Sequence, residues 1–462
     1  SDGGTGKTTA EMQQQATYAH YNFYAVWQID EGNATPIFQD LSGYAAPQAV
    51  DLADLTGDGT PGSPYLITSA DELNAMRQAL TATFQLVNDI DMAATVAWDA
   101  GRGWLPLGDA TTPFTGTLDG AGYTLFNLTV NRPTASYQGL FGYLDGATIE
   151  NLRLENVRIY GAGSVGGLAG KAENSAITDV AVSGEVTGRS NYTGGVLGDL
   201  DGGSLTRATS GVSVRGADNT GGVVGRMSGG SVGHAAGTVR VEGGNSTGGV
   251  VGYMASGALL YESYSLGTVV GNDNVGGLTG RHYSGSPVIV DSYSRAAVNG
   301  SSSVGGAVGY IYNGDVYRTY STGVVTGTSR VGGLVGYEST GGTVADSYWD
   351  TETSGQATSA GGTGKTTAAM QQRATFTNWD FDNVWAIVED TTYPYQRETA
   401  ANLAFFPSYG TYPSSVAATS TITVVANVTW TATTTDTWIT VTGGTSGTGG
   451  GVTSYTIAAN RD

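Results

Sequence analysis

The hydrophobic pattern of this chain centres on a hexapeptide in which two glycines precede two residues that are apolar in almost every copy. Seven copies occur, from VGGLAG at 165–170 to VGGLVG at 331–336. Successive copies lie 28, 27, 27, 28, 29 and 27 residues apart, measured between their first glycines: Gly166, Gly194, Gly221, Gly248, Gly276, Gly305 and Gly332. A fixed period of this size predicts a protein built from stacked structural repeats.

The rest of each repeat has the pattern of strands and turns. Segments such as LGTVVG and TGVVTG alternate in polarity, and β-prone segments such as VIVDSYS and TVADSYWD lie between them and the hexapeptides. A unit of ~27 residues that holds only short strands cannot bury an apolar face alone, so it must pair with its neighbours. We predict an all-β fold whose main part is a parallel β-solenoid (β-helix) of ~27-residue coils with short helical caps.

The apolar pair after each glycine pair needs an explanation, because consecutive side chains of a strand point to opposite faces. One explanation is that another segment covers the outer face of this strand. The other is that the glycine pair introduces a bulge that resets the alternation. The sequence leaves both open.

Before the repeats, the segment TSADELNAMRQAL predicts a helix. Ser69 and Glu72 have the spacing of a capping box, and Leu73, Met76 and Leu80 form one apolar stripe. The strand-like segments FQLVNDIDM and FTGTLDGAGYTLFNLTV follow. A helix that covers the open end of a solenoid protects the unpaired backbone groups of its first coil.

Two segments of the chain are near-duplicates. Residues 2–31 match residues 360–389 at a constant offset of 358, so that Met12 pairs with Met370 and Trp27 with Trp385. Because the second copy follows the repeats, the first is expected to close a preceding solenoid unit. After residue 400 the composition becomes rich in Thr, Ser and Val, and the residues alternate with a period of two between clusters of turn-forming residues. This pattern predicts part of an immunoglobulin-like β-sandwich.

These boundaries predict five parts. They are the closing cap of a preceding unit (1–45), a helical cap with the first coils (46–137), the repeat solenoid (138–352), a C-terminal cap (353–400) and a partial sandwich (401–462).

Composition narrows the class of partner. The 462 residues include 73 glycines and 11 prolines without a Gly-X-Y triplet, which excludes collagen. The net charge is −20 and no Lys/Arg cluster occurs, so nucleic acid is not expected as a partner. No apolar run is long enough for a bilayer span, and the absence of cysteine excludes disulfides and thiolate metal sites.

Four tyrosines occupy equivalent places in SYS, SYS, TYS and SYW: Tyr264, Tyr293, Tyr320 and Tyr348. We expect the coils to stack them as a ladder, with Ala181, Ala208 and His234 at the equivalent places of earlier coils. Stacked rings of this kind fill a solenoid interior or bind sugar rings, and we favour core packing, with the ladder as a candidate ligand site.

Candidate catalytic chemistry is sparse. GTGKTT at 4–9 and 362–367 fails the phosphate-loop spacing, because Ser1 and Ser359 stand where that motif needs glycine. Three histidines and no HExxH motif leave no zinc protease site. Carboxylates such as Asp291 and Asp346 do not recur as an acidic ladder, so a glycosidase-like groove is not expected.

Asp51, Asp54 and Asp58 lie in the oxygen-rich segment DLADLTGDG. They form the one candidate metal site, for Ca²⁺, although the full calcium-loop spacing is missing and a solvated turn is favoured. No catalytic or cofactor-binding residue is predicted.

The repeated GGLVG cores, the PYLI entry, SYWD and the YPY ending resemble the GLUG motif, over residues 57–400. The tail NVTWTATTTDTWITVTGGTSGTGGGVTSYTIAAN resembles the BACON domain. GLUG repeats occur in tandem in large bacterial surface proteins, including adhesins and non-catalytic regions of secreted proteases. The resemblance therefore implies placement outside the cell or on its surface, and an adhesive role.

Taken together, these features predict a non-enzymatic extracellular repeat protein that forms a surface stalk or fibre. Head-to-tail assembly, in which the cap or a strand of one unit completes the next, would make other copies or adjacent units its partners. The alternative is a carbohydrate-binding region of a larger secreted enzyme, with surface glycans as partners.

Overall fold

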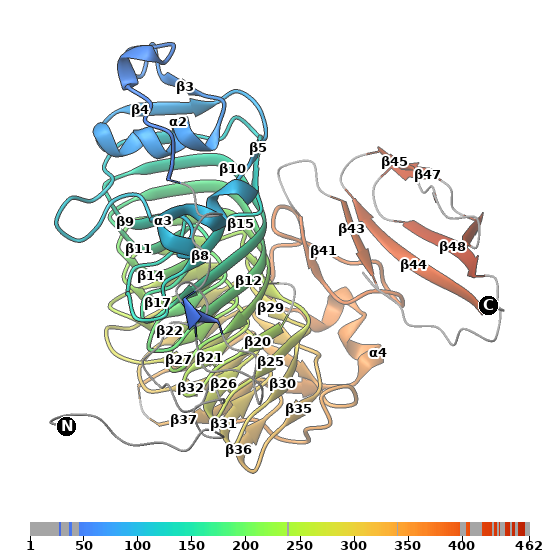
Figure 1. The fold of residues 1–462 in the computed structure, drawn as a ribbon. Helices are drawn as coiled ribbons and strands as arrows, with labels where there is room; N and C mark the ends of the chain where they lie inside the picture. Colours follow the sequence, from blue (N-terminus) through green and yellow to red (C-terminus); the bar gives the residue numbers. More distant parts are fainter. Residues whose placement is uncertain are drawn as a thin grey trace, which may run out of the picture. The chain divides into compact units, whose positions relative to one another are not determined.

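The computed structural model describes residues 46–237, 240–339 and 341–397, with short stretches at 27–28, 37–38, 403–406, 418–426, 429–431, 434, 439–443, 446–448 and 451–457. The chain divides into two units, residues 1–367 and 368–462. The first unit is a parallel β-solenoid, seen in Figure 1 as a stack of coils from green to yellow. The predicted fold class is thereby confirmed.

Three parallel sheets form the coils. Within the described residues the first sheet has eight strands: β9 (Phe141–Asp145), β11 (Ala169–Glu173), β14 (Leu197–Asp201), β17 (Val224–Ser228), β22 (Val251–Ala255), β27 (Thr279–His282), β32 (Val308–Ile311) and β37 (Val335–Glu338). The second, in the same part of the chain, has six: β13 (Thr193–Gly194), β16 (Thr220–Gly221), β21 (Thr247–Gly248), β26 (Asp273–Gly276), β31 (Ser302–Gly305) and β36 (Ser329–Gly332).

The third sheet begins with the long strands β10 (Thr148–Gly161), β12 (Ala176–Gly188) and β15 (Ser204–Arg215). Later coils replace them by shorter strands: β18 (Ser231–Gly233), β19 (Ala236–Gly237), β20 (Arg240–Glu242), β23 (Leu259–Tyr261), β24 (Tyr264–Ser265), β25 (Thr268–Val270), β28 (Val288–Val290), β29 (Tyr293–Ser294), β30 (Ala297–Asn299), β33 (Asp315–Tyr317), β34 (Tyr320–Ser321), β35 (Val325–Thr326), β38 (Thr343–Ala345), β39 (Tyr348–Asp350) and β40 (Thr363–Lys365). Residues one sequence period apart are paired, for example Val224 with Val251.

The first coils precede the hexapeptides, as predicted. They contain η3 (Leu52–Asp54), β3 (Tyr65–Ile67), α2 (Ala70–Ala75), η4 (Met76–Gln78), β4 (Thr83–Leu86), β5 (Ile90–Asp91), η5 (Ala93–Ala97), α3 (Trp98–Gly101), β6 (Thr117–Asp119), β7 (Thr124–Phe126) and β8 (Thr129–Asn131). Strand β4 pairs in parallel with β3 and β6, and β10 continues the sheet from β6, β7 and β8.

Helix α2 begins where the sequence predicted it. The Ser69 hydroxyl accepts a hydrogen bond from the Glu72 N–H at 3.3 Å, and Leu73 and Met76 are buried. The Glu72 carboxylate differs from a capping box, because it accepts from the N–H and hydroxyl of Thr68, one residue before the cap. Continuation into η4 places Met76 on the same buried side.

The glycine pair of each hexapeptide forms a corner between the second and first sheets. In one coil, Thr193–Gly194 belongs to the second sheet, and the first sheet resumes at Leu197. The N–H groups of Val196 and Leu197 both donate to the Val223 carbonyl of the next coil, at 2.9 and 3.0 Å. Two residues opposite one carbonyl form a bulge, so both apolar side chains are buried. The second of the two explanations therefore holds.

Glycine is required at this corner because the chain folds back on itself. A Cβ at Gly221 would lie 2.0 Å from the carbonyl oxygen of Val224, and one at Gly225 would lie 2.6 Å from the N–H nitrogen of Thr193 on the neighbouring coil. Both obstacles are backbone atoms, which cannot rotate away.

A second corner carries charged residues in the left-handed conformation. One column contains a positive-φ residue in each coil: Asn151, Asp179, Arg207, His234, Glu262, Asp291, Arg318 and Asp346. Arg207 pairs with Asp179, and Arg318 donates to both oxygens of Asp291 at 2.7 and 2.8 Å. Asp291 and Asp346 thus belong to a column of mixed charge, which a search of the sequence for acidic residues alone does not reveal.

Among the described residues, one column of the first sheet is apolar except for His282 and Glu338 near its C-terminal end. The fourth position of the first-sheet strands holds Leu144, Ala172, Leu200, Met227, Met254, His282, Ile311 and Glu338. Among the described residues, neither ring nitrogen of His282 has a hydrogen-bond partner, and the side chain is fully buried. Burial lowers the pKa of His282 from 6.5 to about 3.

The second unit starts within α4 (Thr367–Met370), a short helix in the segment TTAAMQ. It continues with η6 (Arg373–Thr375) and the antiparallel pair β41 (Trp385–Ala386) and β42 (Tyr395–Gln396). Trp379 packs on Trp385 with ring centroids 4.4 Å apart. Antiparallel strands follow in the order β43 (Leu403–Phe406), β44 (Ala418–Ala426), β48 (Gly451–Ile457) and β46 (Ile439–Gly443), and β45 (Thr429–Thr431) pairs with β47 (Ser446–Thr448). An immunoglobulin-like sandwich stays a prediction.

The predicted closing cap at 1–45 lies outside the described residues, apart from β1 (Trp27–Gln28) and β2 (Ile37–Phe38), which pair antiparallel. The five-part division of the chain likewise stays a prediction.

Substituting Gly221 by Ala should destabilise the solenoid by about 1–3 kcal/mol or more, because the new Cβ meets a backbone carbonyl. Thermal unfolding followed by circular dichroism measures the effect. Gly62→Ala is the control, since a Cβ there meets nothing within 4 Å. Equal unfolding midpoints for the two variants would contradict the corner geometry.

Acid should destabilise the fold through His282. The pKa of His282 is lower in the folded state than in the unfolded state, so as the pH falls the unfolded chain takes up a proton at a higher pH than the folded chain does. The free energy of unfolding therefore decreases between pH 6.5 and about pH 3, by up to ~1.4 kcal/mol per pH unit. His282→Met, which copies Met254 of the adjacent coil, should remove this contribution in urea unfolding at pH 7 and pH 4. His234→Asn, at a partly exposed histidine, should keep it; an unchanged acid loss in H282M would refute the assignment.

Candidate functional site

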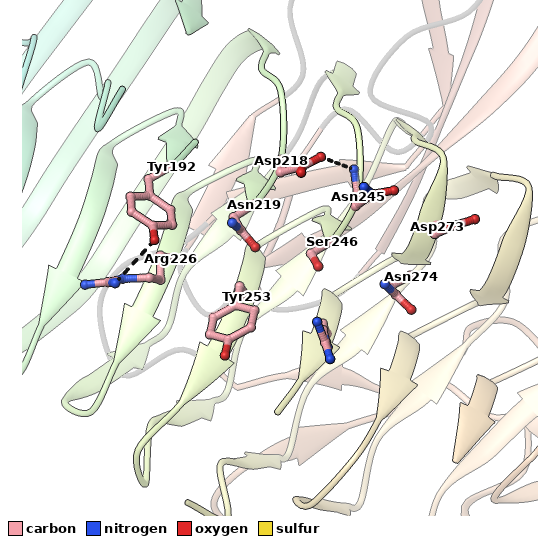
Figure 2. Close-up of a pocket in the computed structure, with 10 residues that line it drawn as sticks. Tyr192, Asp218, Asn219, Arg226, Asn245, Ser246, Tyr253, Asp273 and Asn274 are labelled. Atoms are coloured by element: carbon pink, nitrogen blue, oxygen red, sulfur yellow. Dashed lines mark hydrogen bonds between the residues drawn. The ribbon is translucent and has the colours of Figure 1, made fainter. Parts of the chain in front are cut away.

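A polar groove of about 510 Å³ runs along the solenoid across several coils. It is lined by Tyr192, Asp218, Asn219, Arg226, Asn245, Ser246, Tyr253, Asp273, Asn274 and Arg281. Figure 2 shows residues of successive coils side by side along it. The groove combines aromatic faces, amides, carboxylates and guanidinium groups.

The two sides of the groove come from the residues that flank each hexapeptide. The residue directly after it lies on the first sheet, where Arg226, Tyr253 and Arg281 are in register on adjacent coils. The residue directly before it lies at the corner, where Tyr192, Asn219, Ser246 and Asn274 have φ between 56° and 70°. The final glycine of the hexapeptide lets these two segments approach, because its missing side chain would meet the corner backbone.

Arg226 is held by a buried partner. Its Nε and Nη2 donate to the two carboxylate oxygens of Asp199 at 2.8 and 2.9 Å, and its guanidinium lies 4.6 Å from the Tyr192 ring centroid. The Asp199 side chain is only 5% exposed. Burial raises the pKa of the Asp199 carboxyl, and the Arg226 guanidinium opposes that shift.

Arg281 has a different environment two coils further on. Its guanidinium lies 4.2 Å from the Tyr283 ring centroid and 5.3 Å from that of Tyr310. Its Nε is buried without a hydrogen-bond partner, and within the described residues no carboxylate forms an ion pair with it. Burial raises the pKa of neighbouring Tyr253 and the Arg281 charge opposes that shift, so the phenol stays neutral at physiological pH.

The corner wall supplies hydrogen-bonding groups. The Asp218 carboxylate accepts from the Asn245 N–H at 2.8 Å, a bond drawn in Figure 2. Asp218, Asn245 and Asp273 each come one residue before the left-handed residue of their coil. The groove therefore offers acceptors and amide donors on one side, and aromatic rings with a cation on the other.

The predicted tyrosine ladder is present. Tyr264, Tyr293 and Tyr320 stack with centroids 5.1 Å apart at 5° and 7° between ring planes, and Tyr348 pairs in register with Tyr320. The tyrosines of the ladder are not part of the contiguous apolar core. Tyr293 and Tyr320 are buried all the same. Its equivalents in earlier coils are Ala181, Thr209 and Ala236, which corrects the predicted Ala208 and His234.

The predicted calcium residues serve local turns. Asp51 caps η3 by accepting from the Ala53 N–H, and Asp58 accepts from the N–H and hydroxyl of Thr60. These bonds to Thr60 lower the pKa of Asp58. In the part of the chain that the structure describes, no group of three or more His, Asp or Glu side chains is arranged to hold a metal ion.

The groove was missed by the sequence reading, although a signal existed. The residue after each hexapeptide is large and polar or aromatic in every copy: Lys171, Asp199, Arg226, Tyr253, Arg281, Tyr310 and Tyr337. Only the coil geometry shows that these residues face those that precede the hexapeptide.

The architecture is that of a parallel β-solenoid with a polar groove on its outer surface. A model of the family described as M26 IgA1-specific metallo-endopeptidase N-terminal region matches residues 67–184. Halomucin of Haloquadratum walsbyi is 40% identical over 168 residues, 34% of this chain and 2% of that protein. An immunoglobulin A1 protease of Streptococcus pneumoniae is 29% identical over 156 residues, 34% of this chain and 8% of that protein.

A solved structure of an IgA1 protease is 20% identical, with a TM-score of 0.40, over 62% of this chain and 21% of that chain. The chain therefore spans only a small part of the length of the curated relatives it matches. Among the described residues, no helix has the length and apolar character needed to cross a bilayer.

Removing Arg226 should leave Asp199 as an uncompensated buried charge. We expect Arg226→Gln to lower the free energy of unfolding by about 3–5 kcal/mol at pH 8, and by less at pH 5, because loss of the guanidinium raises the pKa of the buried Asp199 carboxyl further and protonation removes its unpaired charge. Urea unfolding at both pH values measures this. The double variant D199N/R226Q should recover most of the loss; no recovery would show that Arg226 acts through packing alone.

Proposed function

We propose that this chain is a non-catalytic, extracellular β-solenoid region of a larger surface protein, which acts as an adhesive stalk or fibre. The observation that carries the proposal is the unbroken register of the coils from β9 to β37. At ~4.8 Å per coil, seven steps span roughly 34 Å. Resemblance to GLUG and BACON modules and the match to an N-terminal protease region support placement outside the cell.

Assembly is part of this proposal. The near-duplication of residues 2–31 and 360–389 suggests that the same closing segment recurs along a longer series of units. Copies of the chain, or adjacent units of a longer chain, are then its partners through head-to-tail contacts.

A stalk should change its length by whole coils. Deleting residues 304–330 joins Ser303 to Val331, removes one coil in register and leaves the groove residues in place. Because the chain contains no native cysteine, spin labels at Glu155→Cys and Thr343→Cys report one distance, which should shorten by roughly 5 Å.

The control deletes only residues 304–317, half a coil, and should prevent folding of the later coils. An unchanged distance after the full-coil deletion would contradict the stalk. The IgA1 proteases are named for acting on immunoglobulin A1, and cleavage of immunoglobulin A1 by this chain would contradict the non-catalytic part of the proposal.

A second candidate function is that of a carbohydrate-binding region of a larger secreted enzyme. The groove favours it, because amides, carboxylates and tyrosine rings are groups that hydrogen-bond hydroxyls and pack on sugar faces. The glycan-binding experiment described below tests this function as well.

A further inference from the structure

Arg281 is the groove residue whose bonding is incomplete. Its guanidinium lies near the rings of Tyr283 and Tyr310, and its buried Nε donates to no group in the described chain. Because Nε is buried, an oxygen atom that enters the groove meets the terminal nitrogens of the guanidinium, for which the described residues provide no carboxylate partner. Arg281 is thus pre-positioned for an external oxygen.

The comparison with Arg226 shows that this state is specific to one coil. Arg226 occupies the equivalent position two coils earlier, and the Asp199 carboxylate already fills its donor fork. Arg281 has Tyr253 and Tyr310 as its neighbours in the column, neither of which carries a negative charge. The groove therefore contains one saturated guanidinium and one that lacks an anionic partner.

We propose that the groove binds an extended glycan in which isolated acidic sugars alternate with neutral ones, and that Arg281 receives the acidic group. A guanidinium binds carboxylate or sulfate oxygens in a planar fork. Asp218 and Asp273 line the opposite wall, where they accept hydrogen bonds from sugar hydroxyls and repel an anionic group on every sugar. This inference rests on the carbohydrate-binding function proposed above.

The repeat of the solenoid fits such a ligand. Each coil adds one residue to each side of the groove at a spacing of ~4.8 Å, which is comparable with one sugar unit of an extended chain. Tyr253 lies one coil before Arg281 and presents a neutral phenol ring. A neutral sugar over Tyr253 and an acidic one at Arg281 thus occupy neighbouring coils.

The test is a glycan array probed with the full chain, followed by titration calorimetry with the strongest binder. The array carries neutral chains, chains in which a uronic or sialic acid alternates with neutral sugars, sulfated counterparts and uniformly acidic chains. We expect the alternating chains to bind best. Arg281→Gln should weaken that binding at least about tenfold, and Arg281→Lys by less, because it keeps the charge without the fork.

Arg215→Gln is the matched control, because it removes the same charge from a side chain that is 72% exposed and does not line the groove. Its affinity should equal that of the unmodified chain. Thermal unfolding shows whether R281Q and R215Q are folded. If R281Q does not fold, the affinity of R281K is compared with that of R215Q instead.

Three outcomes are distinct. Selective binding of alternating acidic chains that depends on Arg281 supports both proposals. Glycan binding that R281Q and R281K leave unchanged, or that favours neutral or uniformly acidic chains, overturns the role of Arg281 and retains the carbohydrate-binding function. Absence of binding to every glycan overturns both, and leaves the stalk proposal to its own length measurement.

Discussion

The fold depends on the close contact between two backbone segments at the glycine corner. A side chain at the first glycine of a hexapeptide would lie 2.0 to 2.4 Å from the carbonyl oxygen three residues later, in coil after coil. The corner turns the chain from one sheet into the next and lets two consecutive apolar residues face the interior. Sheet spacing, interior packing and the approach of the groove walls all follow from this turn.

Because the corner depends on glycine backbone and apolar side chains, the outward positions are free to differ between coils. The charged column from Asp179 to Asp346 shows this freedom, since acidic and basic residues share one backbone conformation. Exposed pairs such as Asp179 and Arg207 contribute ~0–1 kcal/mol, so they adjust neighbouring coils without holding the fold together. The buried pair of Asp199 and Arg226 is energetically different, because neither partner tolerates loss of the other.

The sequence predicted those features that repeat in residue type. The period, the solenoid, helix α2 at Ser69 and the stack of Tyr264, Tyr293 and Tyr320 all follow from patterns that recur or match a local rule. Features that depend on shared backbone geometry were missed. Asp291 and Arg318 occupy one column although their charges are opposite, and Arg226 and Asn219 face one groove although a folded corner separates them. The position equivalent to the tyrosines was also misassigned in an earlier coil, where the structure pairs Ala236, and not His234, with Tyr264.

The flanking position of the groove residues has an evolutionary consequence. Each coil contributes one residue before and one after an almost invariant corner, so recombination between repeats exchanges surface residues as complete units and leaves the corner intact. Gain or loss of a coil then alters the order of groups along the groove in the same event that alters the length of the stack. In such a gene the length of the solenoid and the chemical groups of its groove can change together, without an intermediate that fails to fold.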